Sequence, residues 1–191
     1  MSIIQQLKEK QEIALVELMK LYGDYLLRTA VLLLKDRQAA EEAVQDTFLT
    51  AFEKIGQLSD ENKLKSWLTC ILINKCRAKM RKKSWKHAFL SLDLLERYAG
   101  DDLHSGPEES LVKLAEHQVL FEAIQQLDYK YKEAIILYYY NELKISEISA
   151  QLKLNENTVK ARLARGRSLL KQLLCKGEEF GGEKNSQESA R

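Results

Sequence analysis

The chain has 191 residues, of which 45% are hydrophobic and 30% charged, so it can build a core and wholesale disorder is excluded. One proline and eight glycines are too few for the many turns of a β-sandwich or barrel, and good helix formers dominate the composition. The formal net charge of +2 excludes little by itself. The predicted fold class is therefore all-α.

Several functional classes lack a sequence signal. No apolar run reaches the length of about 18 residues that a membrane span needs, and Met1–Lys10 is charged where a signal peptide is apolar, which predicts a cytoplasmic protein without membrane insertion. The three cysteines and three histidines have no metal-ligand or redox spacing. No nucleophile or phosphate-binding motif is present. We therefore predict no metal, no cofactor and no enzymatic activity.

The first half has helical periodicity. Apolar residues recur at three- and four-residue intervals from Leu15 to Ala30, and we expect Gly23–Asp24 either to interrupt this helix or to begin another. Asp36 is a predicted N-cap, and the helix after it keeps its spacing to Gly56, a predicted C-cap. Residues 57–63 are polar and predict a loop, after which a further helix begins near Leu64.

The second half is separated from the first by residues without periodicity. We predict a first domain at 1–86, a flexible linker at 87–107, and a second domain at 108–176. Pro107 suits the first position of a new helix. Residues 177–191 predict a polar, frayed tail.

Basic residues gather in two blocks that contain no acidic residue, 71–90 and 158–177, and the stretch 93–109 between them is mostly acidic. The blocks contain Lys75, Arg77, Lys79, Arg81, Lys82, Lys83 and Lys86, and Lys160, Arg162, Arg165, Arg167, Lys171 and Lys176. Two solvated helix faces would give the same pattern. The segregation favours two surfaces for a polyanion such as nucleic acid.

Residues 145–165 read as a helix, a tight turn and a second helix. Ile148, Leu152, Val159 and Leu163 have the spacing of an inward face, and Asn155 or Asn157 can cap the second helix. Lys153 stands where many such turns have glycine. An ordinary helical hairpin is the alternative, but the basic second helix favours a DNA-binding helix-turn-helix. The outward residues are then Asn157, Thr158, Lys160, Ala161, Arg162 and Arg165.

The cluster Tyr138–Tyr139–Tyr140 has two interpretations. The rings could stack on bases, or they could pack between helices. Aromatic side chains pack in cores more often, and we predict core packing for most of this cluster.

Three segments resemble bacterial RNA polymerase sigma factors. Residues 36–49 (DRQAAEEAVQDTFL) resemble the region 2.2 helix, residues 64–83 (LKSWLTCILINKCRAKMRKK) resemble regions 2.3 and 2.4, and residues 157–167 (NTVKARLARGR) look like region 4.2. The segments occur in family order and span most of residues 12–175. The chain leaves no room for region 3 or region 1.1, which points to the compact extracytoplasmic-function (ECF) group.

The resemblance implies a transcription initiation factor with three binding surfaces. It implies that core RNA polymerase (β′ and β subunits) is a partner, and that a coiled coil of the β′ subunit contacts Glu42, Gln45, Asp46, Phe48 and Leu49. It implies that the promoter −10 element contacts Asn74, Lys75, Arg77, Lys79 and Arg81, with an unpaired base held by the loop 58–65. Trp67, beside this loop, could stack on a base, but we predict that it packs in the core of the domain. It assigns the −35 element to Asn157, Thr158, Lys160, Ala161, Arg162 and Arg165.

Two other functions fit parts of the sequence. A stand-alone helix-turn-helix regulator with an N-terminal sensing or dimerisation domain is the main alternative, and a helical adaptor that binds only protein is another. A regulator has no need of a basic helix beside the polar loop, which favours the sigma factor. An anti-sigma factor that clamps both domains is an expected partner, because promoter recognition needs both.

Overall fold

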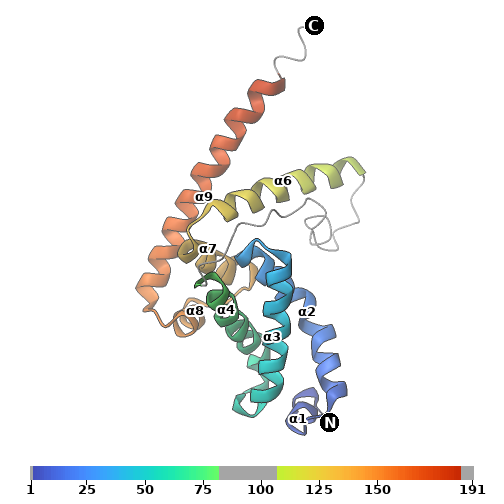
Figure 1. Cartoon of the computed structure of the whole chain (residues 1–191). Coiled ribbons are helices and arrows are strands. Elements are labelled where there is room, and N and C mark those ends of the chain that lie inside the picture. Colours follow the sequence, from blue (N-terminus) through green and yellow to red (C-terminus); the bar gives the residue numbers. More distant parts are fainter. Residues whose placement is uncertain (1, 82–106, 186–191) are drawn as a thin grey trace. The chain divides into compact units, whose positions relative to one another are not determined.

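The computed structural model describes the backbone of residues 2–81 and 107–185 and the side chains of residues 2–81 and 117–175. The chain divides into two compact units, Met1–Leu90 and Ser91–Arg191. Every regular element in the described ranges is helical, which confirms the predicted all-α class (Figure 1). Most of the predicted linker lies outside the described residues.

The first unit is a helical bundle. A short helix α1 (Ile3–Lys8) leads into α2 (Glu12–Leu34), α3 (Arg37–Lys54) and α4 (Leu64–Arg81), and α2, α3 and α4 pack on one another (Figure 1). The short 3-10 turns η1 (Ile55–Gln57) and η2 (Glu61–Lys63) connect α3 to α4. The core combines large side chains from α2 and α4 with alanines from α3, whose small size allows close helix approach. These residues are Leu18, Leu26, Leu33, Leu34, Leu68, Leu72, Ile73, Ala39, Ala40, Ala43 and Ala51.

The predicted N-cap of α3 is confirmed, but two predicted glycine effects are wrong. The Ala39 amide donates to Asp36 Oδ1 over 2.9 Å, as a cap should. Helix α2 runs without a break through Gly23, because one glycine costs only about 1 kcal/mol and the buried Leu18 and Leu26 on either side favour a continuous helix. Gly56 lies inside η1 and does not cap α3.

The second unit contains the helix-turn-helix. Its elements are α6 (Pro107–Gln126), α7 (Tyr129–Ile135), the π-helical turn η3 (Ile136–Tyr140), α8 (Ile145–Leu152) and α9 (Glu156–Asn185). Pro107 is the first residue of α6, as predicted. The core is apolar and includes Ala123, Leu127, Ala134, Ile135, Ile136, Leu137, Ile148, Leu152, Val159 and Leu163.

Helix α9 is longer than the sequence predicts. It continues past Gly177, where the sequence predicts that a polar tail begins, and ends at Asn185. Once a helix is nucleated, each further residue adds a backbone hydrogen bond, so the packed part of α9 can propagate into a polar segment.

Two helical glycines have opposite surroundings, and we predict opposite effects of alanine. A Cβ at Gly23 would meet nothing within 4 Å, whereas a Cβ at Gly166 would come within 2.9 Å of Ile135 Cγ1, where α9 packs on α7. Gly23→Ala should raise the free energy of unfolding by about 0.5–1 kcal/mol through helix propensity. Gly166→Ala should lower it by about 1–2 kcal/mol, because overpacking outweighs that gain.

Urea unfolding followed by circular dichroism measures both glycine variants. Gly23→Ala also serves as the matched control, since it makes the same chemical change in an open position. Stabilisation by Gly166→Ala would mean that Ile135 moves aside without cost.

Candidate nucleic-acid interface

The helix-turn-helix of the second unit is closed by local hydrogen bonds. Asn155 Oδ1 accepts from the Thr158 amide over 2.7 Å and from the Thr158 hydroxyl over 2.8 Å. Asn155, rather than Asn157, therefore caps α9 and fixes the first turn of the helix. Asn157 is exposed and remains available on the outer face.

The four predicted inward residues are confirmed as core. Ile148 and Val159 are fully buried, and Leu152 and Leu163 nearly so. The turn between the helices is held by Ser149, whose hydroxyl donates to the Leu154 carbonyl over 2.5 Å and whose carbonyl accepts from the Leu154 amide over 3.1 Å. The two helices are thus locked in one arrangement, and α9 presents a fixed outer face.

Lys153 takes the left-handed conformation that glycine usually fills in this turn, with φ of 54° and ψ of 45°. A left-handed residue with a Cβ costs about 1–2 kcal/mol, and glycine avoids that cost but loses more chain entropy on folding. Lys153→Gly should therefore raise the free energy of unfolding by about 0.5–1 kcal/mol.

Thermal unfolding of the Lys153→Gly variant measures this effect. Lys171→Gly is the matched control, because it makes the same substitution at an exposed interior position of α9 and should destabilise by about 1 kcal/mol. Destabilisation by Lys153→Gly would mean that the lysine side chain holds the turn in some other way.

The predicted outward residues of α9 lie on its accessible side. Asn157, Lys160, Ala161 and Arg165 are exposed, while Thr158 and Arg162 are half-buried. With about 3.6 residues per turn, Lys160 falls on one flank of this side and Arg165 on the other, with Ala161 between them. The small side chain of Ala161 leaves a shallow strip between the two cations, a shape that is compatible with close approach to base edges in a major groove.

Lys160 lies close to an acidic residue on the same helix. Its Nζ is 4.0 Å from Glu156 Oε2, with both side chains at least half exposed. An exposed ion pair of this kind contributes little to stability, so Lys160 can exchange Glu156 for another anion at a small cost in free energy.

The tyrosine cluster is not in the core, so that prediction is wrong. Tyr138, Tyr139 and Tyr140 are 36%, 51% and 36% exposed. They occupy the π-helical turn η3, whose first residues, Ile136 and Leu137, fill the core and leave the tyrosines outside.

Tyr139 connects η3 to α9. Arg167 donates to its hydroxyl over 3.2 Å, and the rings of Tyr138 and Tyr139 meet edge to face with centroids 4.9 Å apart. Arg167 was predicted only as part of the basic block, and this contact extends the polar surface of α9 onto η3.

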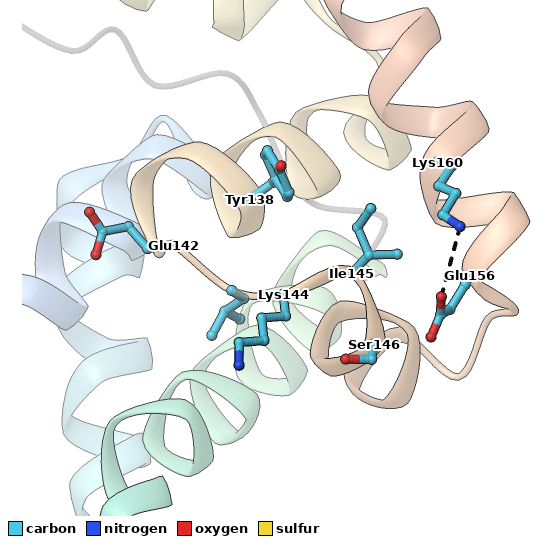
Figure 2. Close-up of a pocket in the computed structure, with 8 residues that line it drawn as sticks. Tyr138, Glu142, Lys144, Ile145, Ser146, Glu156 and Lys160 are labelled. Atoms are coloured by element: carbon cyan, nitrogen blue, oxygen red, sulfur yellow. Dashed lines mark ion pairs between the residues drawn. The ribbon is translucent and has the colours of Figure 1, made fainter.

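An open groove of about 730 Å³ lies between η3, α8 and the start of α9 (Figure 2). It is lined by Tyr138, Glu142, Leu143, Lys144, Ile145, Ser146, Glu156 and Lys160. Its charges are of both signs, and the Lys160–Glu156 pair forms its border on α9. The groove is open to solvent and is not an enclosed ligand site.

In the first unit, the basic residues of α4 divide between two sides of the helix. Arg77 and Arg81 are four residues apart and share one side, while Lys75 and Lys79 share another. Asn74 and Arg81 are exposed, and Lys75 and Arg77 are half-buried. Asn74, Arg77 and Arg81 therefore lie on the same side of α4.

Lys79 is held by another helix. Its Nζ is 2.6 Å from Glu42 Oε2 on α3, and its side chain is only 19% exposed. The sequence placed these two residues on different surfaces, one for DNA and one for the polymerase. The structure brings them together, so neither is fully available until the pair opens.

The predicted docking residues of α3 are exposed with one exception. Gln45 and Asp46 are exposed, and Leu49 is 58% exposed, an unusual position for a leucine. Phe48 is only 3% exposed and belongs to the core, so its assignment to a binding surface is wrong. Phe48 lies four residues after the buried Val44 and so on the same inward face of α3, a sequence signal that its assignment to the docking surface overlooked.

The loop before α4 is anchored at both ends and open between them. Leu58 and Leu64 are buried, and Ser59, Glu61, Asn62 and Lys63 are exposed. Asp60 caps η2 by accepting from the Asn62 amide over 3.0 Å. Trp67 is half-buried. The loop therefore presents polar groups outward on a fixed base.

Among the residues that the structure describes, no cluster of acidic, histidine and cysteine side chains has the arrangement of a metal site. None of the described helices combines the length and apolarity of a membrane span.

Each of the two units matches a known protein family model. The family model described as "Sigma-70 region 2" matches residues 18–86, and "Sigma-70, region 4" matches residues 117–170. SigM of Bacillus subtilis, an ECF RNA polymerase sigma factor, is 30% identical over 161 residues, which cover 84% of this chain and 95% of the relative. SigW of the same organism is 27% identical over 178 residues, covering 90% and 94%.

Solved structures share the fold. CnrH, in complex with the cytosolic domain of CnrY, aligns with a TM-score of 0.62 and 22% identity over 90% of this chain and 94% of its own. The sigma factor RpoE of Bartonella quintana, in complex with the anti-sigma factor NepR, aligns with a TM-score of 0.62 and 23% identity over 83% and 94%. The two sigma regions, in family order and on the two predicted units, show that the chain belongs to the ECF family of RNA polymerase sigma factors.

Proposed function

We propose that this chain directs core RNA polymerase to a specific set of promoters, as a cytoplasmic initiation factor without catalytic activity of its own. The exposed face of α3 docks on the polymerase, the loop 58–65 and α4 bind and melt the −10 element, and α9 reads the −35 element. The observation that carries this proposal is the presence on each of the two units of a helix with basic residues on its accessible side, each helix within a match to a sigma region.

The chemistry of α4 and α9 supports different tasks for the two units. On α9, a strip around Ala161 is flanked by Lys160 and Arg165, an arrangement that fits the major groove of duplex DNA. On α4, Asn74 and Arg81 lie on a helix that follows an open polar loop, an arrangement that fits a single strand with an unpaired base.

An inhibitory partner is part of the proposal. The related structures of CnrH and RpoE contain CnrY and the anti-sigma factor NepR, respectively. We propose that a protein of this kind holds both units and prevents promoter binding, since promoter recognition needs both surfaces at once. Co-purification of the tagged chain with polymerase subunits, but with no inhibitory protein under any growth condition, would contradict this part.

Run-off transcription with core polymerase and genomic DNA tests the main proposal. We expect discrete transcripts that core polymerase alone does not produce. Permanganate footprinting of one such promoter should then show unpaired thymines at the −10 element. A stand-alone regulator would instead bind DNA without polymerase and give no new transcripts, and that result would overturn the proposal.

A further inference from the structure

The N-terminal segment, residues 2–10, packs beside the loop that precedes α4. In helix α1, Ile4 and Leu7 are buried, and the helix packs against α2 and η1. This segment lies before residue 18, where the match to the region 2 family model begins. Sequence reasoning gave it no functional role.

Lys10 joins this segment to the end of α3. Its ammonium donates to the Phe52 carbonyl and, over 3.2 Å, to the Glu53 carbonyl, and it lies 4.8 Å from the centroid of the Phe52 ring. These carbonyls belong to the last turn of α3, directly before η1, where a helix leaves carbonyl oxygens without intrahelical partners. A cation is the favoured partner at this end of a helix.

A second contact reaches the loop itself. The Ser2 hydroxyl donates to Glu61 Oε1 over 3.4 Å. The N-terminal segment thus contacts the chain just before η1, through Lys10, and within η2, through Ser2. Between these points the chain has Ile55 and Leu58 as buried anchors, and its polar residues other than Asp60 are exposed.

The backbone of Lys10 turns the chain out of α1. Lys10 has a φ of 60°, and the amides of Lys10 and Gln11 donate to the carbonyls of Leu7 and Gln6, each over 3.0 Å, which is the Schellman arrangement that ends many helices. Glycine is the usual residue in this left-handed position, so a glycine variant keeps the turn and removes only the side chain.

We infer that Lys10 is a positioning residue for the loop 58–65, holding the end of α3 so that the loop keeps one conformation for capturing an unpaired base. The inference rests on the proposed −10 role of this loop. Lys10 touches no DNA, and its effect is transmitted through the carbonyls of Phe52 and Glu53.

The first test measures loop order in the free, full-length chain by amide hydrogen exchange. Lys10→Met keeps the length of the side chain and removes its charge. We expect amides of residues 55–63 to exchange about tenfold faster, with amides in the middle of α2 and α4 unchanged. Lys10→Arg should restore slow exchange. Lys10→Gly relieves the backbone but lacks the ammonium, so its loop should behave as in Lys10→Met.

The second test measures promoter opening with holoenzyme on a promoter found by run-off transcription. Lys10→Met should slow the appearance of unpaired −10 bases about tenfold, while affinity for core polymerase and for −35 DNA stays unchanged. Lys8→Met is the matched control, because Lys8 is an exposed lysine of the same segment, and it should have no effect.

Three outcomes would overturn the inference. They are an unchanged loop exchange rate in Lys10→Met, an equal effect of Lys8→Met, and wild-type opening by Lys10→Met holoenzyme. If the wild-type chain gave no promoter opening at all, the proposed function would fail instead. The exchange experiment would then still decide whether Lys10 orders the loop.

Discussion

Asp46→Arg is expected to weaken binding to core RNA polymerase by more than about a hundredfold while leaving the helical fold intact. Asp46 is exposed on α3 beside Gln45, and the exposed Leu49 is close by on the same helix. An interface centre combines such an apolar contact with a placed polar group, and its loss costs about 2 kcal/mol or more. Reversing the charge adds repulsion where attraction is expected.

A titration of labelled protein with core polymerase measures this loss, and circular dichroism checks the fold. Asp24→Arg is the matched control, since it makes the same charge reversal at an exposed position of α2. Wild-type affinity in Asp46→Arg would remove this face of α3 from the interface. An equal loss in Asp24→Arg would show that net charge, rather than the α3 surface, is responsible.

Lys160→Ala and Arg165→Ala are each expected to weaken −35 binding by about 1–3 kcal/mol, which is the loss of one good base contact. The loss should depend on the −35 sequence, because both cations flank the strip of α9 that we propose faces the bases. Asn74→Ala and Arg81→Ala should instead impair open-complex formation and leave −35 selectivity unchanged. Lys79 is a poorer test of the −10 surface, since Glu42 holds it.

Binding of holoenzyme to a set of promoters that differ only in the −35 or the −10 element measures this division. Lys171→Ala is the control for a phosphate contact, because Lys171 is exposed on α9 about three turns beyond Lys160. It should weaken binding equally for all promoter sequences. It should also reduce the slope of the log binding constant against the log salt concentration by about one. The same sequence-independent loss in every variant would contradict separate roles for the two units.

The elements set by local pattern could be predicted from the sequence. The N-cap Asp36 could be predicted because its capping hydrogen bond reaches only three residues along the chain, to the Ala39 amide. The inward face of the helix-turn-helix follows from the spacing of Ile148, Leu152, Val159 and Leu163. The exposure of Gln45, Asp46 and Leu49 follows in the same way from the inward face of α3.

The failures arise where packing overrides a local signal. Glycine frequently terminates helices, but Gly56 lies inside a 3-10 turn, and the residues around it, Ile55 and Leu58, are buried. The tyrosines are typical core residues, but the π-helical turn η3 shifts them outward, and no periodicity in the sequence announces such a turn.

The contacts of Lys79 and Lys10 could not be predicted for a different reason. Lys79 lies 37 positions along the chain from Glu42, and Lys10 lies 42 and 43 positions from Phe52 and Glu53. A local sequence pattern cannot predict contacts over such separations.

The ion pair between Glu42 and Lys79 has a thermodynamic consequence for the proposed function. A polymerase that takes Glu42 must break the pair, and DNA that takes Lys79 must break the same pair. The first partner to bind therefore removes a cost from the second, and this cost is limited to about 1 kcal/mol for a partly exposed pair. Linkage is reciprocal, so each partner raises the affinity for the other by up to about fivefold. The free chain, with Lys79 neutralised by its neighbour, would be less readily trapped on random DNA before it finds its polymerase.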